Sequence, residues 1–460
     1  MDRRKFVAAS LGSIFATKLT SAESLLKRGN FIKENLTPHS SQLEFGDLPL
    51  NELVKKYHYY LFDDFLPFMD KYVIDHKYGG FLCNTTLKGE HVNTNKDSWF
   101  EGRGIWVYSF LYRNFGKDEK YLNVARKSLN LILKNKPSDG KLWPQQMTRE
   151  GKPLTPPATE IYGDLFIAEG LSEFALASGE MKYWDLAKSI ILKCWNIYNK
   201  PDYYPQIVAE YLGPKPMPFP GAKIQGVSMV MIGTINNMFK SKNDSDLENI
   251  LNECRNAVIN KHFDPEYRLD TELLNHDYSR PTNYLSQFVY TGHSIETLWP
   301  IMERAVKLRD VELFKTAAER FKRHIEVAWD QVYGGAFRSL NNVDENLWEV
   351  DRLPKALWAQ QEALNGMMIM IEQTGDEWAK NWWFPKVYKY MVDKFLLKQY
   401  GYPLWIVYAD RKVTFDPKYS RIENYHLPRH LMLTYLALER IIKNNGKPAW
   451  RAAFNKKDGQ

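Results

Sequence analysis

The chain has 460 residues, of which 44% are hydrophobic and 25% are charged, a balance that excludes a disordered or fibrous protein and allows a sizeable core. Its formal net charge of +7 comes from Lys and Arg spread along the chain without a basic block, so we expect no nucleic-acid partner. Three widely spaced cysteines, Cys83, Cys194 and Cys254, provide neither a disulfide framework nor a zinc-binding spacing.

The first 22 residues have the composition of an export signal. Arg3 and Arg4, followed by Lys5 and Phe6, resemble a twin-arginine signal. A modest apolar stretch follows, and 20–22 is a small-residue cleavage site. We therefore expect a signal peptide at 1–22, a linker at 23–50 and an exported, periplasmic protein, the alternative being a frayed cytoplasmic N-terminus. No other segment has 18 uninterrupted apolar residues, so no membrane span is expected.

Apolar spacing, punctuated by Gly, Pro and Asp, predicts a series of helices between residues 51 and 445. The expected spans are 51–74, 98–115, 118–135, 159–178, 181–199, 224–240, 244–260, 288–307, 310–329, 355–374, 376–397 and 424–443. Four of the turns, at 114–118, 177–180, 307–310 and 373–376, repeat one pattern of a helix end, a small or charged turn and a new helix.

Gly-Gly pairs at 79–80 and 334–335 and a Pro-rich stretch at 214–220 indicate short β-hairpins and loops between the helical pairs. Six helical hairpins of this length can close into a ring, so we predict an all-α (α/α)₆ barrel at 51–445, followed by a basic tail at 446–460. An open superhelical array is the alternative.

Every second predicted helix opens with unusual polar and aromatic residues, whereas the helices between them are plainer. The openings are Trp99-Phe100-Glu101-Gly102-Arg103, Thr159-Glu160-Ile161-Tyr162-Gly163-Asp164, Gly226-Val227-Ser228-Met229, Gly292-His293-Ser294-Ile295-Glu296, Lys355-Ala356-Leu357-Trp358-Ala359-Gln360-Gln361-Glu362 and Glu423-Asn424-Tyr425-His426-Leu427-Pro428-Arg429. In a ring of hairpins, alternate helices form the inner wall and their N-terminal ends share one face. These residues should therefore converge on one cleft.

Four of these openings, together with Trp106 and Tyr108, resemble the N-acylglucosamine 2-epimerases and their cellobiose 2-epimerase and mannose isomerase relatives. The resemblance runs from about Asn51 to Ile442 and implies a carbohydrate epimerase. The segment Gly226 to Ile232 has no His, unlike the disaccharide and free-sugar branches, so the N-acyl branch is the closer match. The implied substrates are N-acetylglucosamine and N-acetylmannosamine, with cellobiose or a mannose-type sugar as alternatives.

The residue types suit this chemistry. Inverting a carbon next to a carbonyl requires two bases on opposite faces of a planar intermediate, and histidine exchanges protons near neutral pH. We predict His293 and His426 as the catalytic pair and Arg103 as the cation over the developing oxyanion. Because a spacing of three residues shares a helix face, Glu296 is expected to fix the tautomer of His293, and Arg429 to hold His426 neutral. Trp99, Tyr162, Trp358 and Glu362 complete the predicted sugar-binding set.

Other classes remain open because this fold also hosts hydrolases and lyases. A glycoside hydrolase would use two carboxylates among Asp164, Glu160, Glu296 and Glu362. A lyase would use Tyr425 or His426 as its base. His426 and His430 have a zinc-compatible spacing, but no third ligand is suggested, so we expect neither a metal nor another cofactor. A homodimer is compatible with the sequence.

Overall fold

The computed structural model describes residues 44–45, 48–138, 140–204, 219–282, 284–341, 354–408 and 421–450. The predicted signal at 1–22, most of the predicted linker and residues 451–460 of the predicted tail lie outside these ranges. Within the linker, β1 (Glu44–Phe45) pairs antiparallel with β2 (Leu48–Pro49).

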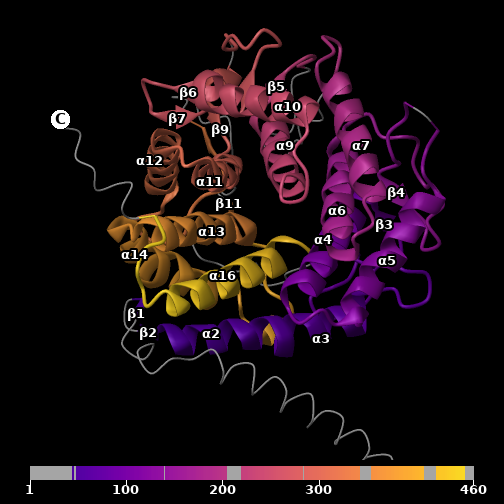
Figure 1. Cartoon of the computed structure of the whole chain (residues 1–460), viewed down its shortest axis with the longest axis horizontal. Coiled ribbons are helices and arrows are strands. Elements are labelled where there is room, and N and C mark those ends of the chain that lie inside the picture. The colour runs from indigo at the N-terminus through magenta and orange to yellow at the C-terminus, as the bar shows by residue number, and fades with distance from the viewer. Residues whose placement is uncertain are drawn as a thin grey trace, which may run out of the picture.

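Six of the described helices form an inner ring (Figure 1). They are α4 (Ser98–Asn114), α6 (Tyr162–Ser178), α9 (Gln225–Met238), α11 (Thr291–Leu308), α13 (Leu357–Thr374) and α16 (His426–Lys443). Each contacts the next in this order, and α16 also contacts α4. The Asn424 side-chain amide donates to the Phe100 carbonyl at 3.0 Å across this last junction. The ring is therefore closed, which excludes the open array.

An outer layer of helices packs around this ring. It consists of α5 (Glu119–Lys134), α7 (Lys182–Tyr198), α10 (Ser245–Asn256) with the π-helical η4 (Ala257–His262), α12 (Val311–Ala328), and α14 (Glu377–Trp382) with η6 (Trp383–Tyr388) and α15 (Lys389–Lys394). The first helical segment runs from α2 (Leu50–His58) through η2 (Tyr59–Phe65) and α3 (Leu66–Phe68) to η3 (Met69–Val73). It packs against α16, so the two ends of the barrel domain meet.

The helix boundaries follow from local turn chemistry. Gly179 and Gly375 end their helices in the left-handed conformation, at φ of 77° and 67°, which glycine adopts without steric cost. Asp118, Asp310 and Asp376 begin the following helices by accepting a backbone N–H of the first turn. The repeated turns predicted from the sequence are therefore confirmed.

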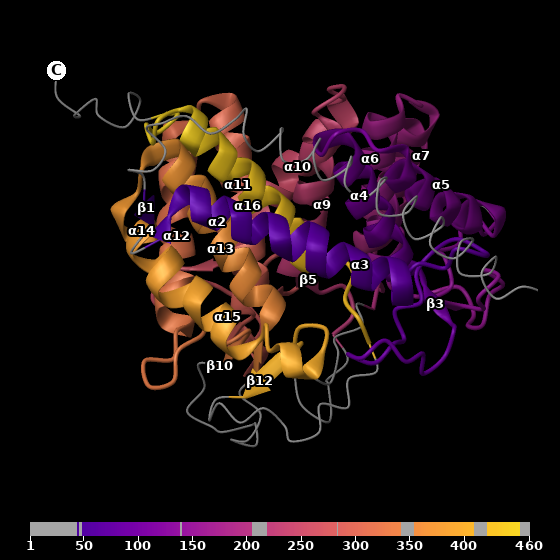
Figure 2. The same ribbon diagram turned by 90° about the horizontal axis from the view of Figure 1, so that it is seen from below.

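Short antiparallel strands lie in the connections between helices, and one of them directly precedes each of the inner helices α4, α9, α11 and α13, near one end of the barrel (Figure 2). The pairs are β3 (Lys96–Asp97) with β4 (Gln146–Met147), β5 (Lys223–Ile224) with β8 (Leu273–Leu274), β6 (Phe263–Asp264) with β7 (Leu269–Asp270), β9 (Phe288–Val289) with β10 (Leu340–Asn341), and β11 (Pro354–Ala356) with β12 (Ile406–Tyr408). The 3₁₀ turns η5 (Tyr284–Gln287) and η7 (Lys398–Tyr400) complete the described elements.

Two of these strand pairs, β3 with β4 and β11 with β12, are each held by a buried lysine that makes the same kind of contacts. Lys96 Nζ lies 3.0 Å from Asp75 and 2.5 Å from the Gly79 carbonyl. Lys355 Nζ lies 2.5 Å from Asp330 and 2.6 Å from the Gly334 carbonyl. The Gly-Gly pairs thus mark a repeated lysine–carboxylate contact that fixes where α4 and α13 begin.

In the described part of the chain, no helix combines the length and apolarity that a bilayer crossing requires.

Candidate active site

A cavity of about 390 Å³ opens at the N-terminal ends of the inner helices, within the range typical of small-molecule sites. Seven predicted site residues line it, namely Trp99, Arg103, Tyr162, His293, Glu296, Trp358 and His426. The other two, Glu362 and Arg429, lie behind its wall, where they contact His426. The inner helices thus bring all nine predicted residues to one place.

His426 begins α16 and is 4% exposed. Its Nδ1 lies 3.0 Å from Glu362 Oε1. Because a carboxylate only accepts hydrogen bonds, this contact places the proton on Nδ1 and leaves Nε2 as the lone-pair nitrogen. The pKa of His426 is lowered to about 3, mainly by burial, with Glu296 and Glu423 acting against this shift and Arg103 and Arg429 adding to it. His426 is therefore neutral at physiological pH.

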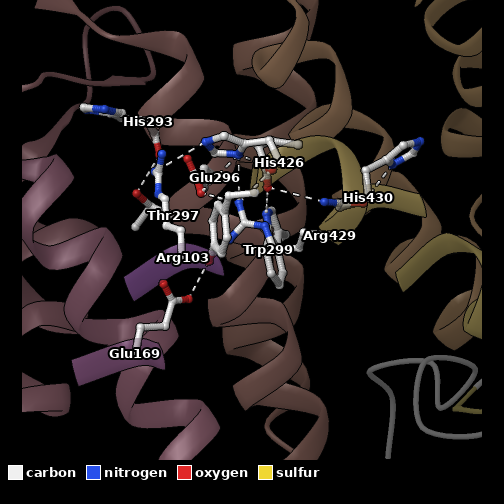
Figure 3. Close-up of polar contacts among 12 residues, drawn as sticks. Arg103, Glu169, His293, Glu296, Thr297, Trp299, His426, Arg429 and His430 are labelled. Carbon is white, nitrogen blue, oxygen red and sulfur yellow. Dashed lines mark hydrogen bonds and ion pairs between the residues drawn. The ribbon is translucent and has the colours of Figure 1, made fainter. Parts of the chain in front are cut away.

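Arg429 forms ion pairs with two carboxylates, Glu296 and Glu362, and Figure 3 shows Arg429 and Glu296 close to His426. Arg429 Nη2 bonds Glu296 and lies 2.7 Å from Glu362 Oε1. Trp299 Nε1 donates to the other Glu362 oxygen at 2.8 Å. Arg429 Nη2 is 3.2 Å from His426 Nδ1. Arg429 was expected to hold His426 neutral, and it does lower the pKa of His426, but burial is the larger cause.

His293 has a different partner from the predicted one. Its Nδ1 lies 2.9 Å from Oε1 of Glu272, a residue between β7 and β8 that the sequence did not single out. The expectation that Glu296 fixes the tautomer of His293 is wrong, because Glu296 turns across the ring to Arg429 on α16. Helical spacing fixes a face of α11 but not which neighbouring helix competes for the side chain.

Gly226 makes room for His293. A Cβ at this position would lie 2.8 Å from Cε1 and Nδ1 of His293 and 2.9 Å from the Tyr162 hydroxyl. The Gly226 N–H also donates to Glu272 Oε1 at 3.3 Å. The absence of a side chain at the start of α9 therefore lets the imidazole reach its carboxylate.

Both histidine rings lie near one indole. The ring centroids of His293 and His426 are 6.0 and 5.4 Å from that of Trp358. The sum of these distances is an upper limit on the separation of the imidazole centroids. The two imidazoles are therefore closer than about 12 Å, the separation beyond which both could not reach the same substrate carbon at hydrogen-bond range.

Arg103 is 6% exposed and lies against aromatic rings. Its guanidinium carbon is 4.0 Å from the centroid of Phe166 and 4.7 Å from that of Tyr425, distances that favour cation–π attraction. Its Nη2 is 3.5 Å from His426 Nε2, and its Nη1 is 3.7 Å from Glu423. The cation therefore lies beside the nitrogen available for proton transfer.

Two further cavity-lining carboxyl groups have raised pKa values. Burial raises the pKa of Glu160 to about 7 and that of Asp97 to about 6. Glu160 accepts the Tyr162 backbone N–H and Asp97 that of Trp99. Both groups thus bond the backbone at helix starts. Asp97 was not singled out from the sequence, and Glu160 was considered only as a carboxylate of a glycoside hydrolase.

Glu296, Glu362 and His426 form the one cluster among the described residues whose spacing could hold a metal ion. Arg429 already engages both carboxylates, so a cation there would have to displace its guanidinium. His430 does not join the cluster, because its nitrogens contact Tyr57 and Asn365. In Figure 3, His430 and His293 lie on opposite sides of Arg429.

The closed ring of helical hairpins with a cleft at one end places the chain among the (α/α)₆-barrel proteins. Solved structures share this fold, among them cellobiose 2-epimerase from Bacillus thermoamylovorans (TM-score 0.69, 18% identity, 84% of this chain and 99% of the other) and a D-mannose isomerase (TM-score 0.67, 14% identity, 87% and 98%). A GH76 α-mannanase of Bacteroides thetaiotaomicron is more distant (TM-score 0.51, 11% identity, 87% and 98%).

Sequence comparison defines the family. Residues 79–428 match the N-acylglucosamine 2-epimerase family, and the chain belongs to it. It is 22% identical over 381 residues to N-acylglucosamine 2-epimerase from Bos taurus, covering 80% of this chain and 87% of the relative. It is 23% identical over 281 residues to cellobiose 2-epimerase from Dictyoglomus turgidum, covering 59% and 69%. The family is one of carbohydrate isomerases.

Proposed function

We propose that the chain interconverts N-acylglucosamine and N-acylmannosamine, or a closely related glycan-derived sugar, by proton transfer at C2 between His293 and His426. The carrying observation is that each histidine presents its Nδ1 to a carboxylate, Glu272 or Glu362. Each Nε2 is then left with a lone pair. Two bases with the same tautomer beside one cavity suit a reaction that must run in both directions.

In this mechanism, Nε2 of one histidine removes the C2 proton of the open-chain aldehyde. The C–H electron pair forms the C1–C2 double bond, and the carbonyl electrons move to O1. Arg103 stabilises the charge that develops there. The other histidine, which has first taken up a proton from solvent at its Nε2, then returns that proton to the opposite face of C2, and the carbonyl re-forms while the first histidine releases the C2 proton to solvent. One proton leaves the sugar and one enters it, so the reaction is balanced without a redox partner.

The N-acyl assignment is supported at the start of α9. Gly226 and Met229 occupy this part of the site, where the segment to Ile232 has no histidine. The relative from Bos taurus also has the N-acyl name. NMR of separate incubations with N-acetylmannosamine, cellobiose and mannose tests the assignment. We expect a 2-epimer from N-acetylmannosamine alone, and conversion of cellobiose or mannose in its place would contradict it.

A glycoside hydrolase is less compatible with these contacts. Asp164 is paired with Lys193 at 2.5 Å and accepts the Trp143 backbone N–H, while Glu296 and Glu362 are both engaged by Arg429. The lyase alternative loses Tyr425 as a base, because its hydroxyl donates to Glu169 at 2.5 Å and accepts from Arg429 at 2.8 Å. Release of reducing ends from oligosaccharides, abolished by Glu362→Gln but not by His293→Asn, would favour hydrolysis instead.

A further inference from the structure

A chain of buried polar side chains runs from the first helix to His426. The Tyr57 hydroxyl on α2 lies 2.9 Å from His430 Nε2, and His430 Nδ1 lies 3.0 Å from Asn365 Oδ1. The Asn365 amide donates to Glu362 Oε2 at 3.4 Å, and Glu362 Oε1 contacts His426 Nδ1. These five residues are at most 4% exposed. The contacts connect three helices, α2, α16 and α13.

The carboxylate of Glu362, between Asn365 and His426, fixes the direction of every hydrogen bond in this chain. Glu362 can only accept, so Asn365 must present its NH₂ group to Glu362 and its carbonyl oxygen to His430. His430 Nδ1 must then bear the proton, and its Nε2 accepts from the Tyr57 hydroxyl. The opposite tautomer of His430 would require a flipped Asn365, which would place its oxygen against the carboxylate.

The ionisation states agree with this direction. Burial lowers the pKa of His430 to about 3 and raises the pKa of Tyr57 well above its usual value of 10. His430 is therefore a neutral imidazole and Tyr57 a neutral phenol. Each link joins a donor to an acceptor, and a network satisfied in this way is rigid because each alternative leaves a buried group unpaired.

We propose that Tyr57, His430 and Asn365 are positioning residues that hold Glu362 in the orientation that sets the tautomer of His426. Glu362 Oε2 is fixed from two sides, by Asn365 and by Trp299 Nε1 at 2.8 Å. This leaves Oε1 directed at His426. The outer helix α2 thereby contributes to proton transfer, although none of its residues lines the cavity. This inference rests on the proposed function, because it needs His426 to act as one of two bases.

The proposal can be tested because this chain of hydrogen bonds reaches only one of the two histidines. The chain ends at His426 and not at His293, so breaking it should slow only the exchange step that His426 performs. Asn365→Leu removes the central link with little change in volume, and Tyr57→Phe removes one oxygen at the far end. Thr374→Val is the matched control, because the Thr374 hydroxyl lies on the same helix as Asn365 but donates to the Met370 carbonyl at 2.7 Å, outside this chain of hydrogen bonds.

For each variant, C2 hydrogen exchange is measured by NMR in heavy water with each purified epimer. We expect Asn365→Leu to lower kcat at least about tenfold, with KM little changed, as is usual when a group orienting a functional histidine is lost. Exchange of one epimer should slow more than that of the other. Tyr57→Phe should slow the same epimer by about two- to fivefold, and Thr374→Val should behave as wild type.

Equal slowing of both epimers would overturn the proposal, because that pattern indicates general loosening of the barrel. Wild-type rates in both chain variants would overturn it as well. If Asn365→Leu does not fold, Tyr57→Phe decides the outcome by the same comparison. Absence of C2 exchange in the wild-type protein is a separate result, and it would refute the proposed function itself.

Discussion

At the level of single residues, the two histidines are distinguished by their carboxylates. Glu272 orients His293, and Glu362 orients His426. Replacing either carboxylate by glutamine keeps the shape but removes the charge that holds the Nδ1 proton. We expect Glu272→Gln and Glu362→Gln each to lower kcat/KM about 10- to 100-fold, and to slow C2 exchange of opposite epimers. Rates are measured by NMR.

Glu160→Gln is the control for this pair, because Glu160 also lines the cavity but bonds the Tyr162 backbone instead. Glu160→Gln should change the C2 exchange rates of both epimers by the same factor. If Glu272→Gln and Glu362→Gln slowed the same epimer, the assignment of one carboxylate to each base would be wrong.

Both histidines, Arg103 and Arg429 could be predicted from the sequence because each lies near the start of an inner helix. An unusual polar residue there stands out when the starts of the six inner helices are compared. Glu272 escaped this reasoning because it lies between two-residue strands that have no periodic pattern. The partner of Glu296 was predicted wrongly for a related reason. Spacing along α11 identifies its neighbours on the same helix, whereas Arg429 reaches Glu296 from another helix.

At the level of elements, α9 contains two glycines with different surroundings. An added Cβ at Gly226 would collide with His293 and Tyr162, whereas one at Gly233 would meet nothing within 4 Å. We expect Gly226→Ala to lower kcat/KM at least about tenfold by displacing the imidazole. Gly233→Ala should keep full activity and raise the unfolding free energy by up to about 1 kcal/mol.

Steady-state kinetics and urea unfolding on the two variants check this prediction. Unchanged activity in Gly226→Ala would show that His293 does not need its observed position. Loss of activity in Gly233→Ala would indicate that α9 tolerates no change, and the comparison would then say nothing specific about His293.

Helix α16 also makes stability depend on pH. Burial lowers the pKa of both His426 and His430 to about 3 from 6.5. Between these values the unfolded chain binds more protons, so each histidine contributes stability above pH 6.5 that is lost as the pH falls. Glu160 and Glu101, whose pKa values burial raises to about 7, act in the opposite sense because their folded forms bind more protons.

A variant isolates one histidine from these opposing contributions. The unfolding free energy of the wild type minus that of His430→Asn should fall by about 1.4 kcal/mol per pH unit between pH 6 and 4.5. Urea unfolding at a series of pH values measures this difference. A difference independent of pH would mean that His430 is not held neutral in the folded protein.

At the level of the whole molecule, the barrel could be predicted because the same residue types recur at the turns between helices. Gly179 and Gly375 end their helices in the left-handed conformation, and Asp residues cap the helices that follow. The pairing of α2 with α16 could not be read from local sequence, since it depends on ring closure. That pairing is what brings Tyr57 to His430.

The destination of the protein is a separate matter. Residues 1–22 lie outside the described part of the chain, and we propose from their twin-arginine-like sequence that they direct export. Mass spectrometry of the protein recovered from a periplasmic fraction should find an N-terminus near residue 23. A chain that stays in the cytoplasm with residues 1–22 attached would contradict this proposal.

The most direct test of the two-histidine account is the fate of the C2 hydrogen in heavy water. The product formed from N-acetylmannosamine should contain deuterium at C2, because the second histidine supplies a proton that exchanges with solvent. His293→Asn and His426→Asn should each lower epimerisation by at least about 10²-fold and retain slow exchange with opposite epimers. Product without deuterium at C2 would contradict the account, since it would mean that the original hydrogen never left the sugar to a solvent-exchangeable base.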